Sequence, residues 1–263
     1  MKKVCIITGA SSGIGRAAAE NMLKRGYKVY GISRRGGDID GVISLCADVT
    51  DEQEILNAVN TVAEESGRID VLINNAGFGI SGAIEFTETE DAEQQFNVNF
   101  FGAVRMCRAV LPIMRKQGFG RIVNIGSVAG DIAIPFQSFY SAAKAALRSY
   151  TLALINEVRE FNITAVCIEP GDIRTGFTAA RHKNTQGDDI YNGRISRSVE
   201  KMENDEQNGM LPETAGKYIA EIASKQSGKP VSIIGGQYKA VGLLKKLLPL
   251  RLTNRIVGAI YAK

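Results

Sequence analysis

The sequence predicts one α/β domain built on a doubly wound parallel sheet of seven strands, with helices on both faces. Short apolar, β-branched runs alternate with segments of helical length along most of the 263 residues. These runs are nearly continuously apolar, as expected for strands that helices cover on both faces. A βαβ series of this length forms a doubly wound sheet, and no Pro/Ser-rich linker or repeat divides it.

The expected elements follow one another in regular order. Strands are predicted where β-branched and apolar residues cluster, and helices where the intervals reach ten residues or more. The expected strands cover residues 4–8, 28–33, 42–46, 71–74, 121–126, 164–168 and 231–234. The expected helices cover residues 14–25, 51–66, 90–116, 138–160 and 212–224.

Two segments fall outside this alternation. Residues 176–209 are polar and dotted with glycines, and a stretch that long inside a compact domain is usually a functional lid or disordered. Residues 237–263 follow the Gly235-Gly236 pair and mix basic with apolar side chains. We therefore expect a domain over residues 1–236, with 176–209 as its substrate lid. Residues 237–263 would add a basic amphipathic helical extension of the same domain.

Composition and charge restrict the class of protein. Hydrophobic content of 44% and charged content of 23% are ordinary for a soluble globular protein. Residues 235–263 hold six basic residues and no acid, so the net charge of +4 leaves −2 on the remainder, which does not indicate nucleic-acid binding. No signal-peptide core and no run of eighteen apolar residues is found, which predicts a cytoplasmic location.

The cysteines and the single histidine do not indicate a metal site. No two cysteines have metal-ligand spacing, and each stands in an apolar segment, so we expect buried reduced thiols. His182 is the one histidine and is expected in a loop, with a place in the substrate pocket as the alternative. The cysteines are Cys5, Cys46, Cys107 and Cys167.

A glycine-rich turn joins the first strand to the first helix. It has the spacing Gly-x3-Gly-x-Gly in the run Thr8-Gly9-Ala10-Ser11-Ser12-Gly13-Ile14-Gly15. Glycines allow a tight turn and let backbone N–H groups approach a pyrophosphate at the positive end of the helix. At the carboxyl edge of the first strand, this turn predicts a dinucleotide site.

A tyrosine and a lysine share one face of the helix expected over residues 138–160. Tyr140 and Lys144 are four residues apart, so the ammonium can lie beside the phenol. A nearby cation favours the phenolate, and we expect it to lower the pKa of Tyr140 toward the working range of an acid–base catalyst.

Six motifs together resemble the short-chain dehydrogenase/reductase family in its Tyr-x3-Lys branch. The similarity runs from Lys3 to about Ile234. It implies a Rossmann-like fold and a nicotinamide-dependent oxidoreductase that interconverts a ketone or aldehyde and an alcohol. It also implies a homodimer or homotetramer, formed through the helices that carry Asn99 and Tyr140. The motifs are Thr8-Gly-x3-Gly-Ile-Gly15, Asn74-Asn75-Ala76-Gly77, Asn99, Ser127, Tyr140-x3-Lys144 and Pro170-Gly171.

The resemblance implies a role for each of four catalytic residues. Tyr140 would protonate the carbonyl oxygen during reduction, and Lys144 would lower its pKa and bind the nicotinamide ribose. Ser127 would hold the substrate oxygen, and Asn99 would hold a water molecule that links Lys144 to solvent. In the alternative, Ser127 caps a strand end and Asn99 only satisfies backbone groups.

The resemblance also implies a set of cofactor contacts. The glycine turn would hold the pyrophosphate, the residues after the third and fourth strands would meet the adenosine, and those after the sixth would meet the nicotinamide. Tyr140 and Lys144 belong to this set as well. The remaining residues are Gly9, Ser11, Ser12, Gly13, Ile14, Gly15, Ser33, Arg34, Arg35, Asp48, Val49, Asn75, Ala76, Gly77, Pro170, Gly171, Ile173 and Thr175.

The end of the second strand favours NADP(H) over NAD(H). Ser33 stands where NAD-preferring members of the family keep a carboxylate, and Arg34 and Arg35 follow. A guanidinium can bind a 2′-phosphate bidentately, whereas a carboxylate would repel it. Solvated loop charges are the alternative.

The sequence says less about the substrate. The tail and the run from Asn99 to Arg105 are most similar to steroid- and retinol-dehydrogenase-type members, so a hydrophobic steroid- or retinoid-like substrate is expected. The alternatives are a 3-oxoacyl thioester reductase and a cofactor-sensing protein without turnover. For the tail, with Leu243, Leu244, Leu247 and Leu248 on one helical face, three interpretations stay open: docking on the body or a partner subunit, a lid over a bulky apolar substrate, or binding to a membrane surface.

Overall fold

A computed structural model describes residues 1–262, and its main sheet has the expected seven parallel strands. The strand order is β3-β2-β1-β4-β6-β7-β9, so the order reverses between β1 and β4. At that switch point the carboxyl ends of the strands leave a crevice, where open α/β sheets bind ligands. The strands are β1 Val4–Thr8, β2 Lys28–Ser33, β3 Val42–Cys46, β4 Val71–Asn74, β6 Gly120–Ile125, β7 Ile163–Pro170 and β9 Val231–Ile234.

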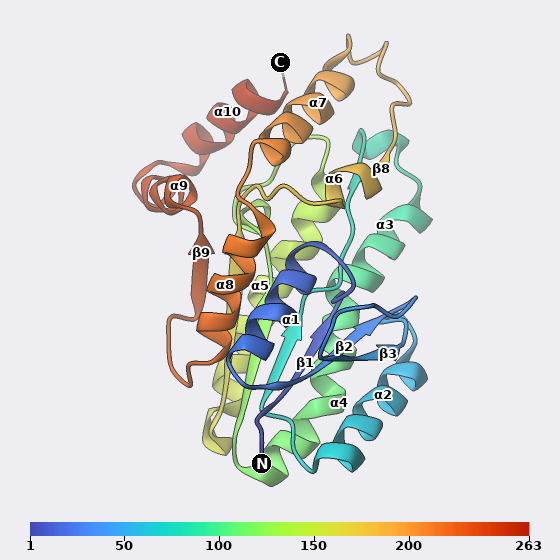
Figure 1. Cartoon of the computed structure of the whole chain (residues 1–263). Coiled ribbons are helices and arrows are strands. Elements are labelled where there is room, and N and C mark those ends of the chain that lie inside the picture. The colour runs from blue at the N-terminus through green and yellow to red at the C-terminus, as the bar shows by residue number, and fades with distance from the viewer. Residues whose placement is uncertain (263) are drawn as a thin grey trace.

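Helices cover both faces of the sheet and bury a hydrophobic core on each (Figure 1). Side chains alternate along β1, so Val4 and Ile6 face one core while Cys5 and Ile7 face the other. The first core lies under α2 Glu52–Ser66, α4 Gly102–Gln117 and α5 Ser138–Val158. The second lies under α1 Gly13–Lys24 and α8 Pro212–Ala223, which pack against each other.

The helix expected over residues 90–116 is broken into three pieces. α3 spans Thr89–Phe96, a π-helical turn spans Asn97–Phe101, and α4 then begins at Gly102. A π-turn inserts one extra residue and rotates the side chains that follow, and such turns are frequent at functional sites. Asn99 lies within this turn and is buried.

The segment 176–209 is ordered, which the sequence analysis did not predict. It forms α6 Phe177–Ala180, the short strand β8 His182–Lys183 and α7 Arg194–Gln207. β8 pairs with β5 Ile80–Ser81, which fastens the segment to the loop after β4. The apolar side chains Ile195, Val199 and Met202 recur at helical spacing and are buried, and this pattern in the sequence could have revealed α7.

The C-terminal extension forms two helices, α9 Gly236–Leu247 and α10 Leu250–Tyr261. α10 packs against α7, as Figure 1 shows in red next to orange, and α9 contacts β9. The four leucines expected on one face divide between two: Leu244 and Leu248 line a cavity, while Leu243 and Leu247 point to solvent. Among residues 1–262, none of the helices is both long and apolar enough to cross a bilayer.

Two expectations about single residues are wrong. Cys46 is exposed at the end of edge strand β3, although Cys5, Cys107 and Cys167 are buried as expected, and all four thiols are free. His182 lies in strand β8 rather than in a loop, is exposed, and faces Asp91 with Nδ1 3.6 Å from Oδ2. Within the described chain, no group of three His, Cys, Asp or Glu side chains is arranged to hold a metal ion.

Candidate active site

A cavity of about 1040 Å³ runs from the glycine turn to the C-terminal helices. Its floor is the carboxyl edge of β1, β4, β6 and β7, where the strand order reverses. α6 and α7 form one wall, and α9 and α10 form another. The position matches the crevice in which open α/β folds bind their ligands.

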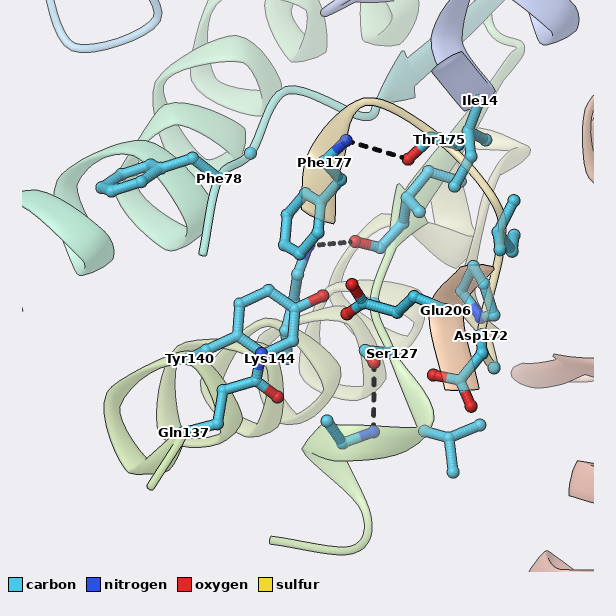
Figure 2. Close-up of a pocket in the computed structure, with 18 of the residues that line it drawn as sticks. Ile14, Phe78, Ser127, Gln137, Tyr140, Lys144, Asp172, Thr175, Phe177 and Glu206 are labelled. Atoms are coloured by element: carbon cyan, nitrogen blue, oxygen red, sulfur yellow. Dashed lines mark hydrogen bonds between the residues drawn. The ribbon is translucent and has the colours of Figure 1, made fainter. Parts of the chain in front are cut away.

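Tyr140 and Lys144 lie together on α5 and both line this cavity (Figure 2). Lys144 is buried, and its Nζ lies 5.7 Å from the centre of the Tyr140 ring. The ammonium donates a hydrogen bond of 2.8 Å to the backbone oxygen of Ile125 at the end of β6. That bond fixes Lys144 against the sheet and directs it to the same edge as Tyr140.

Burial dominates the acid–base properties of this pair. It raises the pKa of Tyr140 to about 12, a rise that a hydrogen bond from Ser127 partly opposes and that the carboxylate of Glu206 increases. Burial also lowers the pKa of Lys144 to about 8. The expected lowering of the Tyr140 pKa is therefore not found, because desolvation of the phenolate outweighs neighbouring charges.

Ser127 lies two residues beyond β6, opposite Tyr140. Its Oγ accepts a hydrogen bond of 3.1 Å from the backbone N–H of Ala129 and so caps the short 3₁₀ turn Val128–Gly130. The hydroxyl also interacts with the Tyr140 phenol. The capping role and the place beside Tyr140 therefore coexist, and the cap orients the hydroxyl toward the cavity.

Asn99 does not line the cavity but supports it from behind. Its Oδ1 accepts a hydrogen bond of 3.0 Å from the N–H of Phe78, and its Nδ2 donates one of 2.9 Å to the oxygen of the same residue. Gly77 lies close to both Asn99 and Lys144, with its Cβ position 3.2 Å from Asn99 Oδ1 and 3.7 Å from Lys144 Nζ. Asn99 therefore fixes the loop after β4, and its role toward water stays a prediction.

The glycine turn is held by the neighbouring strand. Asn75, just after β4, donates from Nδ2 to the backbone oxygen of Thr8 at 3.0 Å, and Thr8 Oγ1 accepts from the N–H groups of Asn75 and Ala76. Gly9 has φ +67°, which favours glycine, and a Cβ on Gly15 would lie 2.2 Å from the oxygen of Gly9. Gly15 thus packs α1 against the turn, and it is the one predicted cofactor residue that does not line the cavity.

The residues present fit a dinucleotide. Backbone and short side chains line the cavity at the turn, and Asp48, Val49 and Ala76 line it farther along the strand edge. Pro170, Gly171, Ile173 and Thr175 close it beside Tyr140. Any larger residue at Gly9 would meet Ala76 backbone at about 3 Å, so the cradle depends on glycine.

The end of β2 offers cationic groups at the far end of the cavity. Arg34 and Arg35 are exposed, line the cavity, and form no ion pair with another described residue. The hydroxyl of Ser33 donates to the backbone oxygen of Gly36 at 2.7 Å, which closes the turn after β2. No carboxylate lines this end apart from Asp48, whose Oδ1 accepts from the N–H and hydroxyl of Thr50.

The segment 176–209 places an aromatic ring and an ion pair beside Tyr140. Phe177 packs edge-on against Tyr140 with ring centres 5.7 Å apart, and the guanidinium of Arg181 lies 5.6 Å from the Phe177 ring centre. Arg181, whose side chain is fully buried, pairs with Glu206 of α7. Glu206 lines the cavity on the side toward which the Tyr140 hydroxyl points (Figure 2).

Asp172 lines the cavity as well. The sequence did not indicate either Asp172 or Glu206 as a site residue. Asp172 follows Pro170-Gly171, so its proximity to a predicted contact could have indicated it, whereas no pattern marked Glu206. Tyr238 of α9 donates a hydrogen bond to Asp172, and burial raises the pKa of this carboxyl. Asp205 pairs with Lys201, and Glu206 pairs with Arg181, but Asp172 forms no ion pair with a described residue.

A Rossmann-type sheet, a glycine turn at its first strand and a Tyr–Lys–Ser group at one cavity define a nicotinamide-dependent oxidoreductase. Residues 3–186 match the family model described as short chain dehydrogenase. The chain therefore belongs to the short-chain dehydrogenase family, whose members act on carbonyl and alcohol groups with NAD(P).

Curated relatives extend over most of the chain. A protein of Bacteroides thetaiotaomicron named 3-ketodihydrosphingosine reductase is 43% identical over 228 residues, covering 86% of this chain and 85% of the relative. A bovine 3-oxoacyl-[acyl-carrier-protein] reductase is 35% identical over 208 residues, covering 76% and 88%. Neither is named for a steroid or a retinoid, so the expected kinship with that branch gains no support from them.

Solved structures of the family have the same fold. A short-chain dehydrogenase from Streptomyces avermitilis has a TM-score of 0.82 and 32% identity, covering 94% of this chain and 93% of its own. The protein ElxO, solved with NADP bound, has a TM-score of 0.75 and 28% identity, covering 91% and 100%. The predicted α/β fold with a seven-stranded parallel sheet is therefore confirmed.

Proposed function

We propose that this chain is an NADP(H)-dependent reductase of long-chain ketones that carry an amino group next to the carbonyl, such as 3-ketodihydrosphingosine. The observation that carries the proposal is that one cavity holds the Tyr140–Lys144 pair, the carboxylate of Asp172, which has no ion pair with a described residue, and a long apolar wall. Each of these three parts corresponds to one part of such a substrate: the ketone, the amine and the hydrocarbon chain.

The apolar wall supports a long-chain substrate. Side chains of α9 and α10 continue the cavity away from Tyr140, and the one charged residue among them, Lys245, pairs with Asp131. A hydrocarbon chain buried there gains roughly 0.8 kcal/mol for each CH₂ removed from water. The wall consists of Val241, Leu244, Leu248, Ile256, Val257 and Ile260.

Asp172 supports an amine close to the reacting carbonyl. Its charge acts on Tyr140, which places it near the reaction centre, and it forms no ion pair with a described residue, although the charge of Lys201 acts on it. Burying an unpaired carboxylate is costly, and a substrate ammonium would supply the missing partner. In 3-ketodihydrosphingosine the amine is on the carbon next to the ketone, so both groups reach this part of the cavity together.

The 43% identical relative supports the same substrate class, because its printed name is that of a 3-ketodihydrosphingosine reductase. A steroid or retinoid has the apolar body but no positive charge for Asp172. A 3-oxoacyl thioester likewise brings no cation, although the 35% identical relative keeps it as the second candidate. A cofactor-sensing role without turnover has no support, since Ser127, Tyr140 and Lys144 lie together.

The residues of the site perform the reduction as follows. The Ser127 hydroxyl holds the carbonyl oxygen, and the Tyr140 hydroxyl donates a proton to it. When bound, the reduced cofactor supplies the hydride to the carbonyl carbon. Lys144 stays cationic near neutral pH, because its pKa lies at about 8, and stabilises the negative charge left on Tyr140.

The raised pKa of Tyr140 supports the direction of reduction. With a pKa of about 12 the phenol is protonated at neutral pH and can act as an acid without prior proton uptake. The reverse reaction would need the phenolate, which burial disfavours. Arg34 and Arg35 support NADPH as the reductant, because their unpaired guanidinium groups suit a 2′-phosphate.

A panel of ketones followed by NADPH absorbance tests this function. It compares 3-ketodihydrosphingosine, its N-acetyl derivative, the ketone of equal length without the amine, and a 3-oxoacyl thioester. We expect the free amine to have the highest kcat/KM, by at least ~10-fold over the uncharged analogues, because a charge-assisted hydrogen bond is lost in them. Faster reduction of the thioester or of the deamino ketone would overturn the proposal.

A further inference from the structure

The C-terminal helices have two apolar faces, and the cavity accounts for only one. Of fifteen large hydrophobic side chains exposed in the described chain, eight lie between residues 241 and 260. Val241, Leu244, Ile256 and Ile260 line the cavity and would contact a substrate. The remaining four point elsewhere.

The second face consists of these four leucines, which we call the leucine face. Leu243, Leu247, Leu250 and Leu252 do not line the cavity, and their exposed fractions are 64%, 75%, 77% and 43%. On α9, Leu243 and Leu247 are four residues apart and share one side of the helix. Leu250 and Leu252 follow at the start of α10, directly after Pro249. A gathering of exposed apolar side chains of this kind marks an interaction site.

Basic side chains border the leucine face without any acid. Lys239, Arg251 and Arg255 are exposed, and no Asp or Glu occurs between Gly235 and the C-terminus. Lys245, on the cavity side, pairs with Asp131 at 2.8 Å and fixes α9 to the body of the protein. Arg251 and Arg255 form no ion pair with a described residue, and they stand next to Leu250 and Leu252 in the chain.

This charge distribution distinguishes a membrane from a second copy of the chain. In a two-fold dimer the leucine face would meet the same face of the other copy, which brings together two surfaces that both carry Arg251 and Arg255 and no acid. The like charges of the two copies would repel each other. An anionic bilayer instead attracts each basic side chain and accepts the leucines into its boundary region.

We propose that α9 and α10 dock on the surface of an anionic bilayer through the leucine face, while their opposite face lines the substrate cavity. The docked helices would then form the wall between the bilayer and the site. A long-chain ketone dissolved in the membrane would pass around them into the cavity. The route of the substrate rests on the proposed function, whereas the docking itself does not.

Co-sedimentation of the full chain with vesicles tests the docking. We expect the protein to pellet with phosphatidylcholine vesicles that contain 30% phosphatidylglycerol, to stay in solution with phosphatidylcholine alone, and to be released by high salt. The variant R251Q/R255Q should bind about 30-fold more weakly, from ~1 kcal/mol per basic residue at an anionic surface. The variant L243E/L247E should abolish pelleting.

The matched control is Leu56→Glu, which changes an exposed leucine on α2, and it should pellet like wild type. Equal pelleting of L243E/L247E and wild type would overturn the docking. So would a dimer in size-exclusion chromatography that L243E/L247E dissociates, because the face would then be covered by a second copy.

Activity measurements separate this inference from the proposed function. With the water-soluble ketone 3-amino-2-butanone, L243E/L247E should reduce the substrate as fast as wild type, and with 3-ketodihydrosphingosine in anionic vesicles it should be at least ~10-fold slower. A protein that pellets with vesicles but reduces neither amino ketone would refute the proposed function alone. A protein that reduces both without pelleting would refute the docking alone.

Discussion

The two ends of the cavity are built in different ways. At the cofactor end, α1 packs Ala18, Ala19 and Met22 without any exposed surface, and Asn75 fastens the glycine turn to the next strand. At the substrate end, Val257 is the one described residue of α9 and α10 that is buried. Regions with few buried contacts open at a lower free-energy cost than the core. The cofactor end is therefore a fixed frame, and the substrate end can open.

This difference corresponds to the two kinds of ligand. A dinucleotide bound at the cofactor end would be met largely by backbone and glycine, which favours a rigid cradle. The proposed long-chain substrate would instead be met by apolar side chains, and it would enter and leave past α9 and α10, which we call the cap. The following predictions test how far the two ends are independent.

The largest effect is expected at Tyr140, where the two ends meet. Tyr140→Phe keeps the ring against Phe177 but removes the proton donor, so turnover should fall by about 10²- to 10⁴-fold. Stopped-flow kinetics and a fluorescence titration with NADPH measure the two effects separately. The dissociation constant for NADPH should stay within about twofold, since the phenol is one contact among many. Retained activity would defeat the mechanism.

Arg181→Met should destabilise the substrate end without destabilising the cofactor end. It leaves Glu206, whose side chain is 13% exposed, with the hydroxyl of Thr178 in place of its ionic partner, a change that costs at most roughly 3–5 kcal/mol. Hydrogen exchange should become faster in residues 176–209 and stay slow in β1 and β4. The control is the double variant Arg181→Met with Glu206→Gln, which removes the stranded charge and should restore part of the protection. Equal acceleration across the sheet would show that the two ends unfold as one unit.

Asp172→Asn should change substrate recognition alone. Loss of a charge-assisted contact worth ~1.5–3 kcal/mol predicts a fall of about 10- to 100-fold in kcat/KM for the amino ketone. The ketone of equal length without the amine serves as the internal control, and its kcat/KM should hardly change. Equal losses on both ketones would assign Asp172 a structural role through Tyr238 instead.

Arg34→Gln should change only the cofactor end. Because the side chain is exposed, its contact with a 2′-phosphate is screened, and we expect NADPH binding to weaken by about 10-fold. NADH binding, measured in the same titration, should stay the same because it has no 2′-phosphate. Tighter binding of NADH than NADPH by the wild type would refute the cofactor preference itself.

The smallest effect on activity is expected at Glu169, which lies on β7 and acts on stability. Glu169 pairs with Arg148 at 2.8 Å, and burial raises its pKa from 4.5 to about 7. A raised pKa of an acid means that the folded state holds the proton more tightly than the unfolded state does. The resulting contribution to stability is complete below pH 4.5 and is lost as the pH rises through 7.

Glu169→Gln removes this titration, because the amide is neutral at every pH. Between pH 4.5 and pH 8, its stability relative to wild type should improve by roughly 3 kcal/mol, because each pKa unit corresponds to ~1.4 kcal/mol. Urea unfolding at the two pH values measures the difference. A constant offset between the two proteins would mean that Glu169 does not titrate in this range.

The sequence predicts the cofactor end almost residue by residue, because that end uses glycine positions and strand-end residues close together in the chain. Every predicted cofactor residue except Gly15 lines the cavity. The substrate end depends on contacts between distant segments, such as Arg181 with Glu206 and Asp172 with Tyr238, and no local pattern records them.

Other differences have identifiable causes. The helix expected over residues 90–116 contains a π-turn at Asn97–Phe101, and the pattern of apolar residues that predicts a long helix does not resolve one inserted residue. The polar composition of residues 176–209 outweighed the short helical pattern of Ile195, Val199 and Met202. The pKa of Tyr140 depends on how completely the fold removes water, which the spacing to Lys144 does not record.

The two-sided cap also has an evolutionary consequence. Leu243 and Leu244 are neighbours in the chain, yet one faces solvent and the other faces the cavity. A mutation at Leu244, Leu248 or Ile260 can shorten or lengthen the space for a substrate without altering the outer surface. A mutation at Leu243 or Leu247 can retune the outer surface without altering the catalytic space. Substrate preference and the binding properties of the outer surface can thus evolve through separate mutations in a single pair of helices.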